Sequence, residues 1–384
     1  MRTIFDRLRA GRTPSPKAPE PLPEAALQGE LPTEPELPPP PPPPPVLDQA
    51  SAAVARASRN TFGSWAARAL AANQADRSLA CHRIWAELPE LHVQPKFQVS
   101  RSDAVFAMGS CFAREVEDAL ADQGFSVPTR CDPIFEQPPL QHDDKLTPGA
   151  RPRAYLNRYN SMSMLGEFRH LLGEAPELEA GLLTYPLDRG AAADLHYTQS
   201  LRQVDQATTL ARRQRVREHL GPLLRDSRLF VLTLGMAECW YDAKAGHYLN
   251  NTPGPRVLAA YGDQLSVHLT RFEQHLAALR ELHALLSRTH GEHFRIVVTV
   301  SPVPLERTFL AQDVVVTNNY SKSMLRAVAQ EFAAAHANVD YFPSYELVSY
   351  ANPQTSWAWD HRHVNAALVA HIMALFARHY VADA

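Results

Sequence analysis

The sequence predicts an α/β fold in which one parallel sheet carries helices on both faces. Two observations predict it. Short apolar runs alternate along the chain with amphipathic stretches of helical spacing, and a turn of small residues follows the first of these runs. Because parallel strands are joined by long, usually helical crossovers, this alternation favours a parallel sheet.

Four apolar runs are expected to be neighbouring parallel strands of that sheet. Their last residues are Met108, Leu234, Val300 and Phe342. Helices are expected over residues 112–123, 264–289, 321–337 and 364–380. In the second of these, leucines recur three or four positions apart, which is the spacing of an amphipathic helix. Residues 126–228 are less regular and interrupted by proline, so we expect long loops and a small insertion over the site there.

The N-terminal quarter of the chain differs in composition from the rest. Residues 1–48 are predicted to be a disordered, Pro-rich arm that ends in eight prolines, a polyproline II spacer of roughly 25 Å. Ile4, Phe5 and Leu8 share one helical face ahead of it, so the arm is either a frayed tail or a peptide that docks on a protein partner. We expect residues 49–95 to be a helical extension and 96–384 to be the α/β domain.

Composition excludes several classes of function. The chain has 384 residues, 45% of them hydrophobic, and a net charge of −3 with both signs interspersed, so we expect no nucleic-acid partner. Its four cysteines have no paired spacing, which favours free thiols in a reducing, cytoplasmic compartment. No run approaches the 18 or so apolar residues of a membrane span, and the N-terminus lacks the apolar core of a signal peptide.

The tripeptide Gly109-Ser110-Cys111 is the most informative feature of the chain. It follows the first predicted strand and precedes a predicted helix, the position where open α/β sheets place their chemistry. It also holds two potential nucleophiles side by side. Near the other end of the chain, Asp360 and His363 form an Asp-x-x-His pair, which completes the inventory of a catalytic triad.

Each candidate nucleophile also has a structural interpretation. Cys111 falls at the start of a helix, where the helix dipole and unpaired N–H groups favour a thiolate, although most free cysteines are simply buried small residues. Ser110 is the rival nucleophile, and serine is also a common helix N-cap. One residue can therefore perform each task, and the register of the motif favours Cys111 as the nucleophile.

The pentapeptide Gly109-Ser110-Cys111-Phe112-Ala113 resembles the motif that gives the GSCFA domain family its name. Further blocks between about residues 95 and 380 are similar to family blocks in the same order; they are Asn157-Arg158-Tyr159-Asn160, Thr233 to Glu238, Thr299 to Pro304, Asn319-Tyr320-Ser321-Lys322 and Tyr341 to Glu346. The resemblance implies membership of the SGNH, or GDSL-like, hydrolase superfamily. It also implies a three-layer α/β/α fold with a flavodoxin-like sheet, and hydrolysis of an ester or acyl group.

The match to that superfamily includes departures. In the superfamily's opening Gly-Asp-Ser block the third residue is the nucleophile, and Cys111 stands at that position, with Ser110 in place of the aspartate. The later Gly-x-Asn-Asp block is matched by Gly235-Met236-Ala237-Glu238, so the amide that usually binds the oxyanion is missing. The Asp-x-x-His block is matched fully by Asp360 and His363.

These residues predict a division of roles. His363 would take the proton of the nucleophile and Asp360 would orient the imidazole. The backbone N–H groups of the nucleophile and of Gly235 would bind the oxyanion, with an amide from Asn160, Asn250 or Asn251, and Glu238 would lie at the substrate. Since His361 and His363 do not complete a tetrahedral set, we expect no metal, and this chemistry needs no cofactor.

The favoured function at this point is an SGNH-like hydrolase of a small-molecule or saccharide ester, with an O-acyl saccharide as one candidate substrate. An acyltransferase with the same triad differs only in its acceptor. The departures from the two superfamily blocks favour a third hypothesis, a domain that binds without catalysis. Trp240, Tyr241, Trp357 and Trp359 flank the site blocks and either stack on substrate or pack in the core.

Overall fold

A computed structural model describes residues 50–65, 77–140, 145–197 and 200–382. The chain divides into two compact units, Met1–Ser58 and Arg59–Ala384. The expected Pro-rich arm, residues 1–48, lies outside the described residues, and the division of the chain into arm, extension and domain stays a prediction. Of the expected helical extension, the structure describes helices α2 (Ala50–Arg59) and α3 (Ala80–Ile84).

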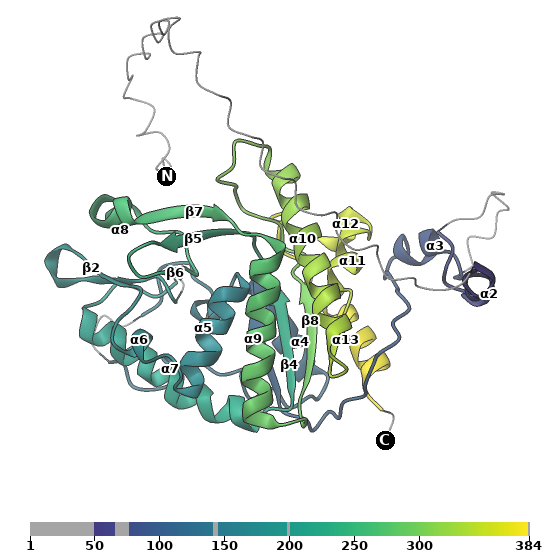
Figure 1. Cartoon of the computed structure of the whole chain (residues 1–384), viewed down its shortest axis with the longest axis horizontal. Coiled ribbons are helices and arrows are strands. Elements are labelled where there is room, and N and C mark those ends of the chain that lie inside the picture. Colours follow the sequence, from purple (N-terminus) through teal and green to yellow (C-terminus); the bar gives the residue numbers. More distant parts are fainter. Residues whose placement is uncertain (1–49, 66–76, 141–144, 198–199, 383–384) are drawn as a thin grey trace, which may run out of the picture. The chain divides into compact units, whose positions relative to one another are not determined.

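A four-stranded parallel sheet forms the centre of the larger unit (Figure 1). Its strands lie in the order β1 (Val105–Gly109), β4 (Leu229–Leu234), β8 (Arg295–Val300) and β9 (Val339–Tyr341). Every neighbouring pair is parallel, which confirms the predicted sheet. The register pairs Gly109 with Thr233 and Thr233 with Thr299, so the carboxyl ends of the first three strands meet at one edge.

Helices cover both faces of this sheet, so the fold has the three layers that the sequence predicts. One face packs on α5 (Ser161–Leu172), α7 (Gln206–Asp226), α9 (Phe272–His290) and α10 (Val314–Ala335). The other packs on α4 (Cys111–Asp122), α11 (Ser344–Ser349) and α13 (Ala366–Tyr380). Strand β1 shows why: Phe106 and Met108 enter the first core, while Val105 and Ala107 enter the second.

The predicted helix over residues 264–289 is wrong at its beginning. Residues Leu265–Leu269 form strand β7, which pairs antiparallel with β5 (Glu238–Asp242); β5 also pairs with β6 (His247–Tyr248). The stretch Leu265-Ser266-Val267-His268-Leu269 satisfies a period of two as well as a four-residue spacing. Pairing with β5 decides between the two, and α9 begins only at Phe272.

Residues 126–228 are more regular than expected. Besides the hairpin β2 (Thr184–Pro186) and β3 (Ala192–Asp194), they form α5 and α7, two of the helices that cover the sheet. Helix α7 continues through Pro222, because Leu220 and Leu224 on either side of the proline are buried in the core. Short elements complete the fold: α6 (Pro176–Glu179), α8 (Pro255–Tyr261), α12 (Pro353–Ser356), η2 (Ala154–Leu156), η3 (Asp188–Gly190) and η4 (Gly262–Gln264).

None of the helices that the structure describes is both long enough and apolar enough to cross a membrane.

Candidate functional site

The turn from β1 into α4 depends on a glycine. Gly109 has φ of +151°, and a Cβ atom added there would lie 2.1 Å from Thr233 Oγ1. The next amide, that of Ser110, donates to Oγ1 of Thr233 at 3.0 Å. Only a residue without a side chain lets β1 approach β4 this closely while the chain turns into the helix. The turn therefore holds Ser110 and Cys111 in a defined place at the carboxyl edge of the sheet.

Ser110 is the N-cap of α4. Its Oγ accepts a hydrogen bond from the Phe112 amide at 3.4 Å, and the residue is only 4% exposed. A capping serine satisfies one of the orphan N–H groups at the start of the helix. The contacts of Ser110 therefore support the role of helix N-cap, which was one of the two roles that the sequence predicts for this residue.

Cys111 is the first residue of α4 and is partly exposed. Its thiol raises the pKa of the His363 imidazole, which is the one link between the two side chains among the described residues. Its backbone N–H has no intrahelical partner, as is general for the first turn, and it donates to no acceptor in the described part of the chain. The thiol and a free N–H group thus lie together at the positive end of a helix dipole.

The Asp360–His363 pair lies in a tight turn before α13. Asp360 Oδ2 is 2.5 Å from His363 Nδ1, and Oδ1 accepts from the amides of Arg362 at 3.1 Å and His363 at 2.9 Å. The N-cap of α13 is Asn365, so Asp360 is not the helix cap that an ordinary helix entry would make it. With Nδ1 bound to Asp360, the other ring nitrogen of His363 is left for Cys111.

Hydrogen bonds change the protonation of this pair. The Cys111 thiol, followed by the hydrogen bond to Asp360, raises the pKa of His363 above its ordinary value despite partial burial. The hydrogen bond from His363 and those from two amides hold the pKa of Asp360 well below its usual range. Asp360 is therefore an anion at neutral pH, and it favours the imidazolium form of His363.

Gly235 lies against Ser110, directly after β4. A Cβ atom added to it would lie 2.8 Å from the Tyr159 carbonyl oxygen and 3.3 Å from Ser110 Cβ. Lys322 Nζ donates to its carbonyl at 2.8 Å, and the next amide, Met236, donates to the Tyr159 carbonyl at 2.9 Å. The Gly235 N–H itself donates to no acceptor among the described residues. These two hydrogen bonds hold the turn in place, and they leave the Gly235 N–H without an acceptor among the described residues.

The predicted side-chain amides are engaged in local structure. Asn160 caps α5: its Oδ1 accepts from the Ser163 amide at 2.8 Å, and its Nδ2 donates to the Leu249 carbonyl at 3.1 Å. Asn250 bonds to the amide of Tyr159 at 2.9 Å and to the carbonyl of Asn157 at 2.8 Å. These bonds fasten the loop that precedes α5 and contacts Gly235.

Glu238 is also engaged. It is 3% exposed, and its two carboxylate oxygens accept from Thr308 Oγ1 at 2.9 Å and the Phe309 amide at 2.6 Å. The residue predicted to lie at the substrate thus holds the loop between β8 and α10. Of the flanking aromatics, Trp240 packs edge-on against Phe309, whereas Trp359 is 92% exposed next to Asp360.

Two residues near the site, Lys322 and Tyr159, belong to blocks that resemble the family but received no role from the sequence. Lys322 on α10 is 1% exposed, and burial lowers its pKa to about 7. Tyr159 is partly buried, and burial raises the pKa of its hydroxyl. A signal for Lys322 existed: it precedes the buried Leu325 and Ala329 by three and seven positions, which places it on the buried face of the helix.

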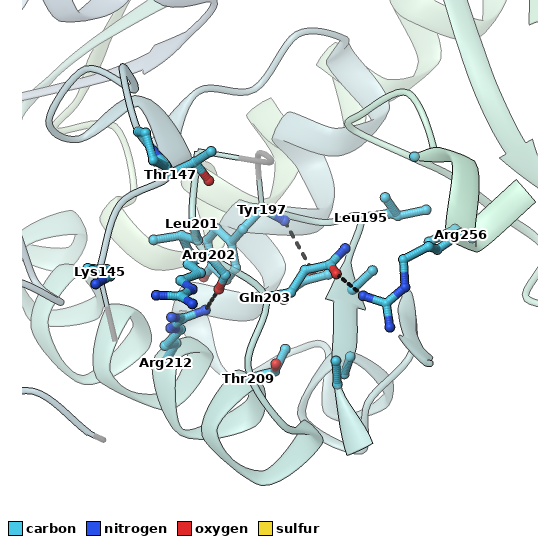
Figure 2. A pocket seen from close by; sticks show the side chains of 17 residues that line it. Lys145, Thr147, Leu195, Tyr197, Leu201, Arg202, Gln203, Thr209, Arg212 and Arg256 are labelled. Carbon is cyan, nitrogen blue, oxygen red and sulfur yellow. Dashed lines mark hydrogen bonds between the residues drawn. The ribbon is translucent and has the colours of Figure 1, made fainter. Parts of the chain in front are cut away.

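A cavity of about 770 Å³ is lined by none of these residues. Its lining comes from residues 145–148, the β2–β3 region, α7 and α8, and it combines alanine, leucine and valine with four basic side chains, Lys145, Arg202, Arg212 and Arg256 (Figure 2). Arg212 donates to the Arg202 carbonyl at 2.8 Å and Arg256 to Gln203 Oε1 at 2.9 Å, two of the contacts dashed in Figure 2. Neither the Cys111 thiol nor the Asp360–His363 pair lines it.

Among the described residues, no group of three or more His, Cys, Asp or Glu side chains is placed to hold a metal ion.

Fold and candidate site together define a three-layer α/β protein in which a thiol begins α4, directly after β1, and a hydrogen-bonded imidazole–carboxylate pair lies in the turn before α13. The chain belongs to the GSCFA family, whose sequence model matches residues 104–376. Among solved structures it is similar to a Clostridium thermocellum family 3 carbohydrate esterase, at 9% identity over 72% of this chain and 94% of that one, with a TM-score of 0.28. No curated protein matches the sequence.

Proposed function

We propose that this protein is an SGNH-like acyl hydrolase in which Cys111 is the nucleophile, His363 the general base and Asp360 the residue that orients it. The observation that carries the proposal is the bond of 2.5 Å between His363 Nδ1 and Asp360 Oδ2, in an imidazole whose pKa the Cys111 thiol raises. A nucleophile in contact with a base that a third group orients is the geometric signature of covalent acyl transfer.

The reaction proceeds in two halves. His363 accepts the thiol proton while Sγ attacks the ester carbonyl, and the negative charge moves to the carbonyl oxygen. Two N–H groups without protein acceptors, those of Cys111 and Gly235, are available to bind that oxyanion. As the tetrahedral intermediate collapses, the C–O bond breaks and His363 returns its proton to the leaving alcohol. A thioester remains on Cys111.

In the second half, His363 removes a proton from water, which attacks the thioester. The acid is released and the proton returns to Sγ, so enzyme and charge are restored. If an acceptor hydroxyl replaces the water, the same thioester makes the protein an acyltransferase.

The exposed Trp359 ring beside Asp360 favours a saccharide ester, because sugars stack on aromatic faces. Four free cysteines suit a reducing compartment, and we propose a cytoplasmic location.

The test is to trap the acyl-enzyme with 4-nitrophenyl acetate. We expect Cys111→Ala to abolish turnover and the acetylated peptide, with a loss of at least about 10³-fold. Ser110→Ala is the matched control, since it changes the adjacent residue and removes only a cap, at a cost of about 0.5–2 kcal/mol of stability. Hydroxylamine at neutral pH should release the acetyl group, as it does from a thioester.

Two results would overturn the assignment. If Ser110→Ala abolishes acetylation and Cys111→Ala does not, the nucleophile is the serine. If neither residue is ever acylated and no acyl substrate is turned over, the domain binds without catalysis.

A further inference from the structure

The cavity drawn in Figure 2 has the size and the walls of a small-molecule site. Its volume of about 770 Å³ lies within the range of roughly 300–1,000 Å³ that ligand pockets occupy. Apolar side chains make up much of its lining, and several of them are at most 2% exposed: Ala192, Leu195, Tyr197 and Val257. The cavity is therefore bounded by packed structure, and its apolar wall favours the hydrocarbon part of a ligand.

Basic side chains outnumber acidic ones in this lining. The basic ones are Lys145, Arg202, Arg212 and Arg256. Against these four, the lining includes one carboxylate, that of Asp194. Its two oxygens accept from the guanidinium of Arg213 at 2.8 Å each, and Arg213 is not a lining residue. The lining thus carries more positive than negative charge, and its one carboxylate is already paired from outside the cavity.

Backbone contacts bring three of these cations together. The Arg202 amide donates to the Lys145 carbonyl at 3.1 Å, and the Arg212 guanidinium donates to the Arg202 carbonyl at 2.8 Å (Figure 2). Arg212 lies on α7 and is only 4% exposed, whereas Lys145 and Arg202 are exposed. A guanidinium held in place beside two further cations suits a carboxylate, because charge-assisted hydrogen bonds from arginine to an anion are among the strongest that proteins make.

We propose that this cavity binds a small organic anion, whose carboxylate lies at Lys145, Arg202 and Arg212 and whose hydrocarbon part lies against the apolar wall. An inorganic anion would leave the apolar wall without a partner, and a neutral hydrocarbon would leave the three cations without one. Only a ligand with both parts matches the whole lining.

The fourth cation of the lining has a structural role. Arg256 forms an ion pair with Asp188 and donates to Gln203 Oε1 at 2.9 Å, so it fastens α8 to the segments around it. The proposed anion site goes beyond the acyl hydrolase and does not depend on it, because neither Cys111 nor His363 lines the cavity.

The test is isothermal titration calorimetry of the full chain with octanoate, which joins a carboxylate to a short hydrocarbon chain. Two comparison ligands are titrated alongside: octan-1-ol, which is uncharged and of the same length, and inorganic phosphate, an anion without a hydrocarbon part. We expect octanoate to bind at one site per chain. Both comparison ligands should bind at least about tenfold more weakly, because each lacks one of the two parts that the lining matches.

Variants place the bound octanoate. Arg212→Gln should weaken its binding at least about tenfold, because the variant removes a charge-assisted hydrogen bond. Arg215→Gln is the matched control and should leave the affinity unchanged. Arg215 lies three positions further along α7 and also donates to a backbone carbonyl, that of Pro138 at 2.6 Å, but it does not line the cavity. The double variant Lys145→Gln, Arg202→Gln changes two exposed residues and should weaken octanoate at least about fivefold.

The proposal is overturned if octanoate does not bind, if octan-1-ol or phosphate binds as tightly, or if Arg215→Gln weakens octanoate as much as Arg212→Gln. If Arg212→Gln does not fold, the double variant decides, and an unchanged affinity in it overturns the proposal. The acid that the proposed hydrolase releases is also a carboxylate. Octanoate binding that is lost in His363→Ala and kept in the cavity variants would place the ligand at the candidate active site instead. Absence of ester turnover leaves the cavity proposal intact, since calorimetry measures binding alone.

Discussion

Gly235→Ala tests the oxyanion site with the smallest change the chain allows. The new Cβ would lie 2.8 Å from the Tyr159 carbonyl oxygen, whereas ordinary contact begins at 3.4 Å, so the backbone must separate by 3.4 − 2.8 = 0.6 Å. Neither group yields easily, because that carbonyl accepts the Met236 amide and the Gly235 carbonyl accepts Lys322. The Gly235 N–H is therefore displaced from its present position beside Ser110.

We expect Gly235→Ala to lower both kcat and the free energy of unfolding, by different amounts. Loss of one oxyanion donor lowers kcat by about 10²–10³-fold. The overpacking lowers the free energy of unfolding by about 1–3 kcal/mol, measured by urea denaturation. The rate of Cys111 alkylation by iodoacetamide should change little, since Gly235 is not among the groups that shift the pKa of His363.

The assay is steady-state hydrolysis of 4-nitrophenyl acetate by a folded variant. Gly262→Ala is the matched control, because a Cβ there meets nothing within 4 Å and its φ of −55° suits alanine. A Gly235→Ala protein with wild-type kcat would refute the assignment of Gly235 as a donor. Equal losses in both variants would show that the assay reports stability alone.

Two further predictions concern charged pairs. Asp360→Asn should lower the pKa of His363, because it removes a partner that favours the imidazolium; an NMR titration of the His363 ring checks this, and an unchanged pKa would contradict it. Since the pKa of His363 is raised in the folded state, its contribution to the free energy of unfolding is full below about pH 6.5 and is lost as pH rises through the folded value. The variant should show a weaker pH dependence of stability, because the contribution of Cys111 remains. Arg158→Met should cost about 3–5 kcal/mol in urea unfolding, because Arg158 is fully buried 2.6 Å from the Glu167 carboxylate, which would remain. A loss under about 1 kcal/mol would show that other contacts stabilise the buried Glu167 carboxylate without Arg158.

Local sequence was sufficient for the sheet and for the two segments of the site. The four predicted strands are all present and parallel. Their apolar runs are buried on both faces of the sheet, and such continuous apolar runs are typical of parallel strands. The Gly-Ser-Cys turn and the Asp-x-x-His turn were found because each concentrates chemistry-bearing residues at an element boundary. Residues 265–269 were mistaken for helix because their spacing fits both periods, and only the partner strand β5 selects one.

The supporting residues of the site could not be found in this way. Asn160 and Glu238 have the right chemistry for a site, yet their hydrogen bonds are taken by Ser163, Leu249, Thr308 and Phe309. Conversely, Lys322 looked like any helical lysine until its burial against Gly235 was known.

The amino-acid sequence by itself determined the class of fold, the order of the strands along the chain and the identity of the nucleophile candidates, since these follow from local periodicity and residue chemistry. Only the tertiary structure decided which candidate side chains are engaged in local hydrogen bonds, which amides remain without acceptors among the described residues, and where a lysine is buried. These depend on contacts between residues far apart in the chain, such as Lys322 with Gly235. Such contacts form when helices pack on a sheet, and local sequence patterns do not predict them.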